Sequence, residues 1–254
     1  MTDSRYGFAL SLVRRCGEFL LEHESLRSSV SVKRENDYVT VADRTVEDML
    51  VKAIHEEYPE DSFYAEESGT SGSSQDRWII DPIDGTVNFM NGFPGYTISV
   101  AFERGGEILF GLVYVPRQCL MFRAYLGKGA FLNDERLAIE ERELHESLIL
   151  LVPPHRRHEE LDRYIEIERR LYEDFSDVRS IGSAAFSLCS TSASWCAAYY
   201  ERFLNLYDIA AGLIIVREAG GKAEYTENGD GALNVLSGSP DAFERVLEVL
   251  DGKI

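Results

Sequence analysis

Apolar side chains at helical spacing predict two amphipathic helices near the N-terminus. The first pattern predicts a helix over residues 5–23, and its members are Tyr6, Leu10, Val13, Gly17 and Leu20. The second predicts a helix that ends before Pro59, and its members are Val46, Met49, Leu50, Ala53 and Ile54. The run SGTSGSS at 68–74 follows and predicts a flexible loop.

Apolar residues in the middle of the chain predict β-strands. A short buried strand begins at Trp78 and runs directly into an acidic turn. Ile98, Val100 and Phe102 alternate along the chain, and the glycine pair at 105–106 then turns it into two further apolar strands. The predicted strands cover residues 78–80, 98–102, 108–115, 120–125 and 147–152, and residues 127–137 close the meander.

The last part of the chain predicts helices again. Residues 184–200 are rich in Ala and Ser, and residues 209–219 form an apolar segment that ends at a glycine pair. Ser239 and Pro240 supply an N-cap and a first-turn proline for a final helix. Because no repeat or long linker divides the chain, the pattern predicts one α+β domain over residues 1–254 with layered sheets.

The composition indicates an acidic globular protein with a net charge of −18. A negative field repels nucleic acid and anionic membrane surfaces, so neither is an expected partner. The same field would repel a phosphate substrate unless bound cations neutralise some carboxylates. An acidic surface that only keeps the protein soluble explains the charge equally well.

Cysteine and histidine usage favours a reducing compartment. The cysteines are scattered without a CxxC pair, which predicts reduced thiols and a cytoplasmic location; they are Cys16, Cys119, Cys189 and Cys196. Apolar runs of membrane-spanning length and a signal-peptide pattern are absent from the sequence. His155 and His158 lie in a polar stretch that predicts an exposed loop or helix start, not a zinc site.

The acidic turn at 81–89 is the strongest candidate for chemistry. Asp81 and Asp84 follow a hydrophobic strand, and Pro82 stiffens the turn so that both carboxylates can converge. Hard oxygen ligands of this kind suit Mg²⁺ or Mn²⁺. Backbone N–H groups at Gly85 and Thr86 open the next turn, where an anion can bind. Taken alone, the same residues fit a plain turn.

Further acids lie before or after the predicted helices. Glu66 and Glu67 are adjacent, which is typical of a solvated face. Asp208 and Asp43 both precede or begin helical segments, where an aspartate is usually an N-cap. Each of these acids is ambiguous by itself, but together they supply enough carboxylates for two or three divalent ions.

The order of the motifs resembles the inositol monophosphatase family along nearly the whole chain. The signature W-x-x-D-P-x-D-G-T-x-N-F stands at 78–89, and W-D-x-A-x-G stands at 207–212 with Tyr207 in place of the tryptophan. That exchange predicts altered packing beside a ligand and retained chemistry. The remaining matches are E-E-S at 66–68, G-K-G-A-F at 127–131, R-S-x-G-[ST]-A-A at 179–185 and E-A-G-G at 218–221.

The resemblance implies a layered αβαβα sandwich of the inositol monophosphatase and fructose-1,6-bisphosphatase type. It also implies a homodimer, inhibition by Li⁺, and two or three Mg²⁺ ions per active site, with Mn²⁺ as a substitute. The small partner would be a phosphorylated sugar or cyclitol.

Residue roles follow from the same resemblance. Glu67, Asp81 and the Ile83 carbonyl would hold one Mg²⁺, and Asp81, Asp84 and Asp208 would hold the second. A third, weaker ion would lie near Asp43 and Glu67, and Thr86 would orient the attacking water beside these acids. Substrate contacts are implied for Asp84, Gly85, Thr86, Arg179, Gly182, Ser183, Ala184 and Glu201.

These residues predict a Mg²⁺-dependent phosphomonoesterase that uses metal-activated water, with inositol 1-phosphate as the favoured substrate. A fructose-1,6-bisphosphatase or a dual-specificity enzyme is the alternative, and it needs a basic group for the second phosphate. Arg179 and Arg202 are candidates, although both fit surface ion pairs equally well. A noncatalytic metal-binding regulatory protein on the same scaffold is a remote alternative.

Overall fold

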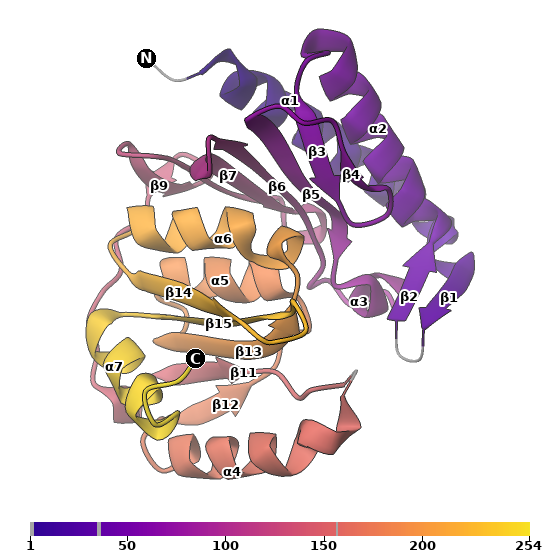
Figure 1. The fold of residues 1–254 in the computed structure, drawn as a ribbon. Helices are drawn as coiled ribbons and strands as arrows, with labels where there is room; N and C mark the ends of the chain where they lie inside the picture. Colours follow the sequence, from indigo (N-terminus) through magenta and orange to yellow (C-terminus); the bar gives the residue numbers. More distant parts are fainter. Residues whose placement is uncertain (1–2, 35–36, 156) are drawn as a thin grey trace.

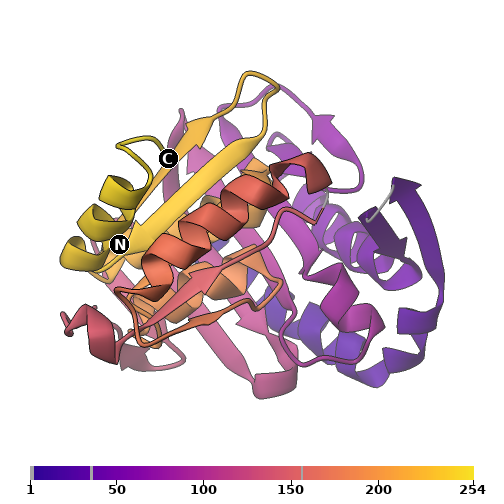
Figure 2. The ribbon, with the colours of Figure 1, turned by 90° about the horizontal axis from the view of Figure 1, so that it is seen from below.

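The computed structural model describes residues 3–34, 37–155 and 157–254, and it stacks helices and sheets in alternating layers (Figure 1). One helix pair covers the outer face of a large sheet, a second lies between the two sheets, and a third covers the smaller sheet (Figure 1, Figure 2). This arrangement confirms the predicted αβαβα sandwich. The pairs are α1 (Ser4–Glu22) with α2 (Val41–Glu57), α5 (Ala184–Ser192) with α6 (Leu206–Glu218), and α4 (Leu161–Tyr172) with α7 (Pro240–Val249).

The larger sheet contains the predicted meander. Its strands β6 to β9 pair antiparallel with their sequence neighbours, whereas β3 pairs parallel with β5. The position of β5 next to both β3 and β6 brings the acidic turn to one edge of the helix layer between the sheets. In spatial order the strands are β10 (Glu135–Arg136), β9 (Gly129–Leu132), β8 (Leu120–Tyr125), β7 (Glu107–Val115), β6 (Thr97–Arg104), β5 (Asp76–Asp84), β3 (Ser62–Ala65) and β4 (Gly69–Ser71).

The smaller sheet is mixed. Its second strand, β11, runs parallel to both neighbours, and β15 runs antiparallel to both of its own. In spatial order the strands are β12 (Asp177–Arg179), β11 (Leu148–Leu151), β13 (Ala198–Leu204), β15 (Leu233–Gly238) and β14 (Lys222–Glu227). The remaining elements are the hairpin β1 (Val30–Arg34) and β2 (Asp37–Thr40), the short helix α3 (Thr86–Met90), and 3₁₀ turns at Glu24–Ser28, Pro116–Gln118, Leu144–Glu146 and His158–Glu160.

Strand β5 is apolar on both faces because helices cover both sides of its sheet. Trp78 and Ile80 pack in the core that α1 and α2 share with this sheet. Ile79 packs on the other side, in the core shared with α5 and α6. The alternation of side chains along a strand therefore directs residue 81 toward the layer of α5 and α6.

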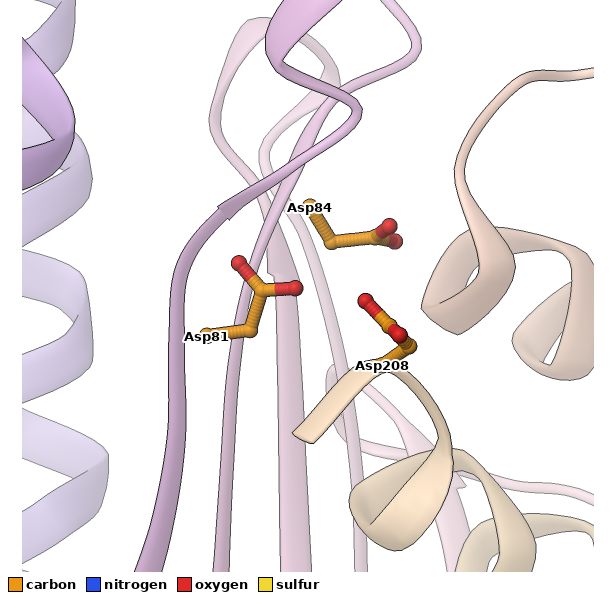
Figure 3. A group of neighbouring side chains, drawn as sticks. All are labelled: Asp81, Asp84 and Asp208. Atoms are coloured by element: carbon orange, nitrogen blue, oxygen red, sulfur yellow. The ribbon is translucent and has the colours of Figure 1, made fainter. Parts of the chain in front are cut away.

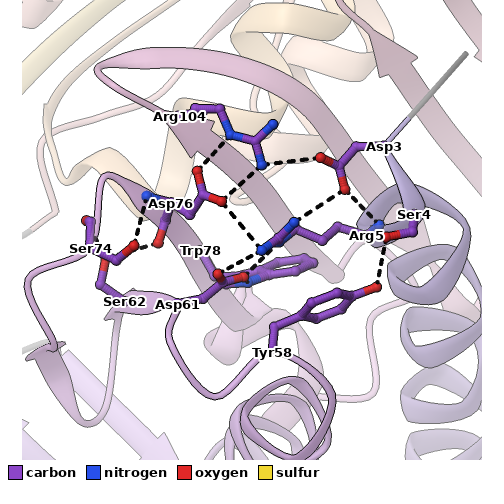
Figure 4. Close-up of polar contacts among 10 residues, drawn as sticks. All are labelled: Asp3, Ser4, Arg5, Tyr58, Asp61, Ser62, Ser74, Asp76, Trp78 and Arg104. Atoms are coloured by element: carbon purple, nitrogen blue, oxygen red, sulfur yellow. Dashed lines mark hydrogen bonds and ion pairs between the residues drawn. The ribbon is translucent and has the colours of Figure 1, made fainter.

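An ion-pair network fixes the start of β5 to the N-terminus of α1 (Figure 4). Arg5 donates to both oxygens of Asp61 at 2.7 and 2.8 Å, and Arg104 donates to both oxygens of Asp76 at 2.6 and 2.8 Å. The indole N–H of Trp78 adds a 2.9 Å hydrogen bond to Asp61. These contacts hold one end of β5, so that its other end carries the acidic turn on a fixed strand.

Two predictions about elements were wrong in part. The segment 184–200 is helical only as far as Ser192, and its end belongs to β13, which pairs with β11 and β15. Ser194 has a φ of 55°, and this left-handed residue ends the helical turn. The predicted loop at 68–74 contains β4, which pairs with β3. Over the ranges that the structure describes, no helix is both long and apolar enough to cross a membrane.

Candidate active site

A cavity of about 580 Å³ opens where β5 ends, between the larger sheet and the N-termini of α5 and α6. Three acids line it and approach one another closely: Asp81, Asp84 and Asp208 (Figure 3). Each offers one carboxylate oxygen, and these oxygens lie within 4.8 Å of one another. The structure thus brings together three of the predicted metal ligands from two distant parts of the chain.

A bulge in β5 explains why two acids three residues apart face the same cavity. Asp81 pairs with Ser99 of β6 and Asp84 pairs with Thr97, so three steps on β5 match two on its partner. A regular strand would place positions 81 and 84 on opposite faces, whereas an inserted residue restores the same face. Ile83, which lies between them, packs into the core beneath α1 and α2.

Asp208 reaches the cavity from the first turn of α6. Its carboxylate accepts a 2.5 Å hydrogen bond from the backbone N–H of Asn205, which completes a capping box. The capping interpretation of this residue and the metal-ligand interpretation are therefore compatible. The cap fixes the carboxylate at the helix start, and Oδ atoms remain within reach of Asp81 and Asp84.

The acids of this cluster repel one another electrostatically. Burial raises the pKa of Asp81 well above its ordinary value, and the negative charges of Glu66, Asp84 and Asp208 raise it further. A divalent cation would relieve both effects, and clustered carboxylate oxygens are the ligands that Mg²⁺ and Mn²⁺ prefer. The donor set therefore fits a hard divalent metal.

Asp84 is held by the N-terminus of α5. Ser183 Oγ donates to it at 2.5 Å, and the backbone N–H groups of Ala184 and Ala185 donate at 3.1 and 2.8 Å. Burial raises the pKa of Asp84, and these hydrogen bonds oppose that shift. Because the Ala184 N–H is used by Asp84, any contact of Ala184 with a substrate would involve its other atoms.

Thr86 lies beside the metal cluster and is oriented by Asp43. Its hydroxyl lies 3.2 Å from Asp43 Oδ1 and 3.2 Å from the Ile83 carbonyl oxygen. The other carboxylate oxygen of Asp43 accepts hydrogen bonds from the backbone N–H and the hydroxyl of Thr40. Asp43 is fully buried, which raises its pKa, while the Thr40 and Thr86 contacts oppose the shift. The structure therefore places Thr86 against Asp43, one of the acids beside which the resemblance put it.

Glycine is required at the turn that joins the acids to Thr86. Gly85 has a φ of 89°, and an added Cβ would lie 3.1 Å from the Gly182 carbonyl oxygen and 3.2 Å from that of Gly95. The Asn88 side chain donates to the Gly95 and Ile181 carbonyls at 2.7 and 2.8 Å. This close packing joins the acidic turn to the segment that precedes α5.

The structure places Glu66, not the predicted Glu67, at the cavity. Glu66 lines it and shares a hydrogen bond with Asp81, whereas the lining residues within the described chain do not include Glu67. The alternation along β3 gives the reason. Tyr64 packs on the side of α6, against Tyr207, so position 66 falls on that side and position 67 on the other. Extending this alternation past Ala65 identifies Glu66 once the face of β3 that looks toward α6 is known.

The predicted substrate contacts divide into two groups. The first group lines the cavity and contains Asp84, Gly85, Thr86, Gly182, Ser183, Ala184 and Glu201. Glu201 also accepts a 2.5 Å hydrogen bond from the Tyr199 hydroxyl.

Arg179 does not reach the cavity. Its guanidinium pairs with Asp177 at 2.5 Å, and its side chain lines a neighbouring apolar hollow with Phe93 and Trp195. Arg202 is held by Glu160 at 2.6 Å and stacks on Phe203. The position of Arg179 follows from β12, whose last residue turns outward just before the chain enters the site at Ser180.

Sequence reasoning missed three residues at the cavity mouth. Tyr38, His155 and His158 line it, together with Val152 and Pro153 from the end of β11. The polar stretch around the histidines did predict an exposed loop or helix start, and both histidines are exposed. The only usable signal was their position directly after a predicted strand of the smaller sheet.

Comparisons with known proteins agree with the fold and the site. A model of the inositol monophosphatase family matches residues 1–247. An inositol-1-monophosphatase from Mesorhizobium japonicum is 37% identical over 223 residues, which cover 86% of this chain and 83% of that protein. A putative Nus factor SuhB from Neisseria meningitidis serogroup B is 34% identical over 254 residues, covering 97% of each.

A solved structure shows the same architecture. The extragenic suppressor protein suhB from Bartonella henselae superposes with a TM-score of 0.92 at 31% identity, covering 99% of this chain and all of that one. The match spans both sheets and all three helix layers, and the family match includes every acid of the cavity. By fold, motif order and sequence identity, this chain belongs to the inositol monophosphatase family.

Proposed function

We propose that the protein is a Mg²⁺-dependent phosphatase that hydrolyses a phosphate monoester of a small sugar or cyclitol, with inositol 1-phosphate as the favoured substrate. The observation that carries this proposal is the cluster of Asp81, Asp84 and Asp208 within 4.8 Å. A noncatalytic scaffold would have no need for the second feature beside it, the hydroxyl of Thr86 oriented by a buried aspartate.

Oxygen donors of the cavity would hold the metal. We assign this role to the carboxylates of Glu66, Asp81, Asp84 and Asp208 and to the carbonyl of Ile83, with Glu66 replacing the predicted Glu67. When bound, Mg²⁺ supplies an acidified water and neutralises charge on the phosphate and the leaving oxygen. Two or three ions, with Mn²⁺ as a substitute, match this number of acids.

The protein's own groups would orient the nucleophile. When Thr86 donates its hydroxyl hydrogen to Asp43, its oxygen lone pairs are left to accept a hydrogen bond from water. This hydrogen bond from the water to the Thr86 oxygen would hold the water in one orientation relative to the phosphorus atom. The described residues that line the cavity include no cysteine, and Ser183 donates its hydroxyl to Asp84, so direct attack by water is the favoured route.

The opposite wall would recognise the substrate. Gly182 and Ser183 face the cavity where the phosphate and the first ring atoms would lie. Glu201, oriented by Tyr199, would accept hydrogen bonds from substrate hydroxyls. An acidic acceptor suits a polyhydroxylated ring such as inositol, because each ring hydroxyl can donate one hydrogen bond.

Two alternatives remain within this proposal. A fructose-1,6-bisphosphatase or dual-specificity enzyme would use the same metal chemistry and would need a basic group at the cavity mouth. A regulatory role is the second, because relatives that match across 97% of this chain carry the name putative Nus factor SuhB. Retention of Asp81, Asp84, Thr86 and Asp208 in one cavity supports catalysis over a purely regulatory role.

The test is phosphate release from myo-inositol 1-phosphate and fructose 1,6-bisphosphate, measured side by side. We expect turnover with Mg²⁺, loss of turnover with excess chelator, and recovery when Mg²⁺ is restored. Full turnover in excess chelator would contradict the metal mechanism. Absence of turnover on a panel of sugar and cyclitol phosphates, by protein that binds Mg²⁺, would favour the regulatory alternative.

Three further expectations belong to the same proposal. A homodimer can be tested by sedimentation, and inhibition by Li⁺ can be tested in the phosphate-release assay. A cytoplasmic location can be tested by fractionation.

A further inference from the structure

Glu47 is a buried acid that the proposed chemistry does not use. It lies on α2, and only 3% of it is exposed. Glutamate is almost never buried this completely unless its oxygens have partners, because removing them from water is costly. The partners of Glu47 therefore indicate what the residue does.

Both oxygens of Glu47 accept hydrogen bonds from the segment that follows Glu66. The backbone N–H of Glu67 donates to Oε2 at 2.8 Å, and that of Ser68 donates to Oε1 at 2.7 Å. Just before this segment, the backbone N–H of Glu66 donates to the Ile80 carbonyl of β5 at 3.1 Å. The backbone is thus held immediately before and immediately after the Glu66 side chain.

The same helix also orients Thr86. Asp43 lies four residues before Glu47, and positions four apart share one face of a helix. Asp43 accepts from the Thr86 hydroxyl, while Glu47 accepts from the Glu67 and Ser68 amides. One face of α2 therefore fixes both a group that would orient water and a group that would bind metal.

We propose that Glu47 is a positioning residue, which holds the segment after Glu66 so that the Glu66 carboxylate is placed beside Asp81 before the metal binds. The inference rests on the proposed function, since it concerns the affinity of that site for a divalent cation. A ligand already in place binds metal more tightly than one that must be ordered, and supporting contacts of this kind typically change metal affinity by about 10–100-fold.

The decisive variant is Glu47→Gln, which keeps the shape of the side chain. Its amide nitrogen must face one of the two N–H groups, donor against donor, so at least one of the hydrogen bonds is lost. We expect the affinity for Mn²⁺, measured directly by electron paramagnetic resonance without substrate, to fall about tenfold. Hydrogen exchange at residues 66–71 of the metal-free protein should become faster than in the wild type.

Glu218→Gln is the matched control. Glu218 accepts from the backbone N–H groups of Gly127 and Gly129 at 2.8 and 2.7 Å, which is the same arrangement on a loop that does not line the cavity. This control should lose the corresponding contacts and keep the wild-type affinity for Mn²⁺. Glu47→Asp, which retains the charge but is shorter by one methylene, takes the place of Glu47→Gln if that variant does not fold.

Several results would overturn the inference. An unchanged Mn²⁺ affinity in Glu47→Gln, with or without a lower melting temperature, would make Glu47 a purely structural residue. Equal losses in Glu47→Gln and Glu218→Gln would show a general effect of loop loosening. Fast, unprotected hydrogen exchange at the backbone amides of residues 66–71 in the metal-free wild type would show that Glu47 does not hold this segment. These measurements require no turnover, so they remain decisive even if the wild type releases no phosphate.

Discussion

Ser183 donates a 2.5 Å hydrogen bond to Asp84, a residue 99 positions earlier in the chain. The contact joins the end of β5 to the N-terminus of α5, and the same hydroxyl also accepts from the N–H of Phe186 at 3.3 Å. One side chain therefore caps a helix and orients a proposed metal ligand. This coupling means that metal affinity and helix stability depend on the same residue.

We expect Ser183→Ala to weaken both properties. Loss of a hydrogen bond to a carboxylate costs about 1.5–3 kcal/mol, and loss of a serine cap costs about 1 kcal/mol, with the two effects sharing one hydroxyl. The free energy of unfolding should fall by roughly 2–3 kcal/mol, and half-maximal activity should require more Mg²⁺. Denaturant unfolding and a Mg²⁺ titration of phosphate release measure the two effects.

Ser190→Ala is the control for this substitution. Ser190 is buried in the same helix and donates to the Phe186 carbonyl at 2.8 Å, so it contributes a similar hydrogen bond without contacting an acid. It should lower stability and leave the Mg²⁺ requirement unchanged. The same shift in Mg²⁺ requirement in both variants would assign the effect to the helix, not to Asp84.

Asp81→Asn should abolish most activity without destabilising the metal-free protein. The folded state raises the pKa of Asp81 through burial and neighbouring acids, so it binds a proton more tightly than the unfolded chain. The unfolding free energy of metal-free wild type must therefore fall as the pH rises above the ordinary value of 3.8. The neutral asparagine removes this contribution, so the variant should melt at or above the wild-type temperature at pH 7 in chelator.

The measurement for Asp81→Asn pairs thermal melting in chelator with turnover in Mg²⁺. Near-normal turnover would show that Asp81 is only a turn residue. A marked drop in metal-free stability at pH 7 would show that its hydrogen bond to the Ile83 N–H, at 3.1 Å, outweighs the charge repulsion.

Thr86→Val should remove the water-orienting hydroxyl while keeping the branched shape of the side chain. A positioned group in proton transfer or water activation typically contributes 10²–10⁴-fold, so we expect kcat to fall by about two orders of magnitude or more. Thr86→Ser retains the hydroxyl beside Asp43 and should retain most of the rate. Equal losses in both variants would point to the packing of α3 and not to the hydroxyl.

Hydrophobic patterning predicted much of the fold because its signal is local. Residues 97–125 alternate or run apolar and form β6, β7 and β8 as expected. Residues 198–200 were predicted to end a helix because the segment 184–200 is rich in Ala and Ser. They instead begin β13, whose pairing with β11 and β15 is a long-range contact. Pairing between distant strands, which the local pattern does not contain, determines the secondary structure of that segment.

The site was predictable where one motif supplied it and less so where side-chain direction mattered. Asp81 and Asp84 stand in one short motif that identified both as candidates, although their convergence depends on the bulge in β5 opposite β6. The choice between Glu66 and Glu67 depends on which face of β3 looks toward α6, and this became clear only from the packing of Tyr64. Arg179 was misplaced because β12 directs it away from the cavity, toward Asp177.

Stability in acid should depend on Asp76, at the start of β5 (Figure 4). The hydrogen bond from Arg104 lowers the pKa of Asp76 below its ordinary value of 3.8, with burial opposing and the charges of Arg104 and Arg5 assisting. Because its pKa is lower in the folded state, ionised Asp76 stabilises the fold above pH 3.8. This stabilisation is lost as the pH falls through the folded-state pKa.

We therefore expect Asp76→Asn to be less stable than wild type at pH 7, by about 0.5–1 kcal/mol since the pair is partly exposed. The difference should shrink toward zero as the pH falls from 3.8 through the lowered pKa of Asp76, because the wild-type carboxylate then becomes protonated. Urea unfolding at several pH values measures it. Glu166→Gln breaks the exposed pair with Arg169 and should have no measurable effect at either pH. A deficit for Asp76→Asn that persists in acid would indicate lost packing, not lost charge.

The substrate range should be decided at the cavity mouth and not by Arg179. A bisphosphate needs a donor for the phosphate that is not cut, and the described residues that line the cavity include no lysine or arginine. His155 and His158 are the basic side chains that do line it. Arg179 is paired with Asp177 and lies along the neighbouring hollow. Arg179→Ala should therefore leave kcat/KM unchanged on both fructose 1,6-bisphosphate and inositol 1-phosphate.

Replacing both histidines with alanine should separate the two substrates. Loss of a hydrogen bond to a phosphate costs about 1.5 kcal/mol or more, so kcat/KM for the bisphosphate should fall by roughly tenfold. Inositol 1-phosphate carries only the reacting phosphate, which the metal cluster would hold, and its kcat/KM should change much less.

A selective loss on the bisphosphate in Arg179→Ala would instead mean that β12 moves when substrate binds. An equal loss on both substrates in the histidine variant would mean that the loop supports the shared site, because a contact with the second phosphate alone cannot affect a monophosphate.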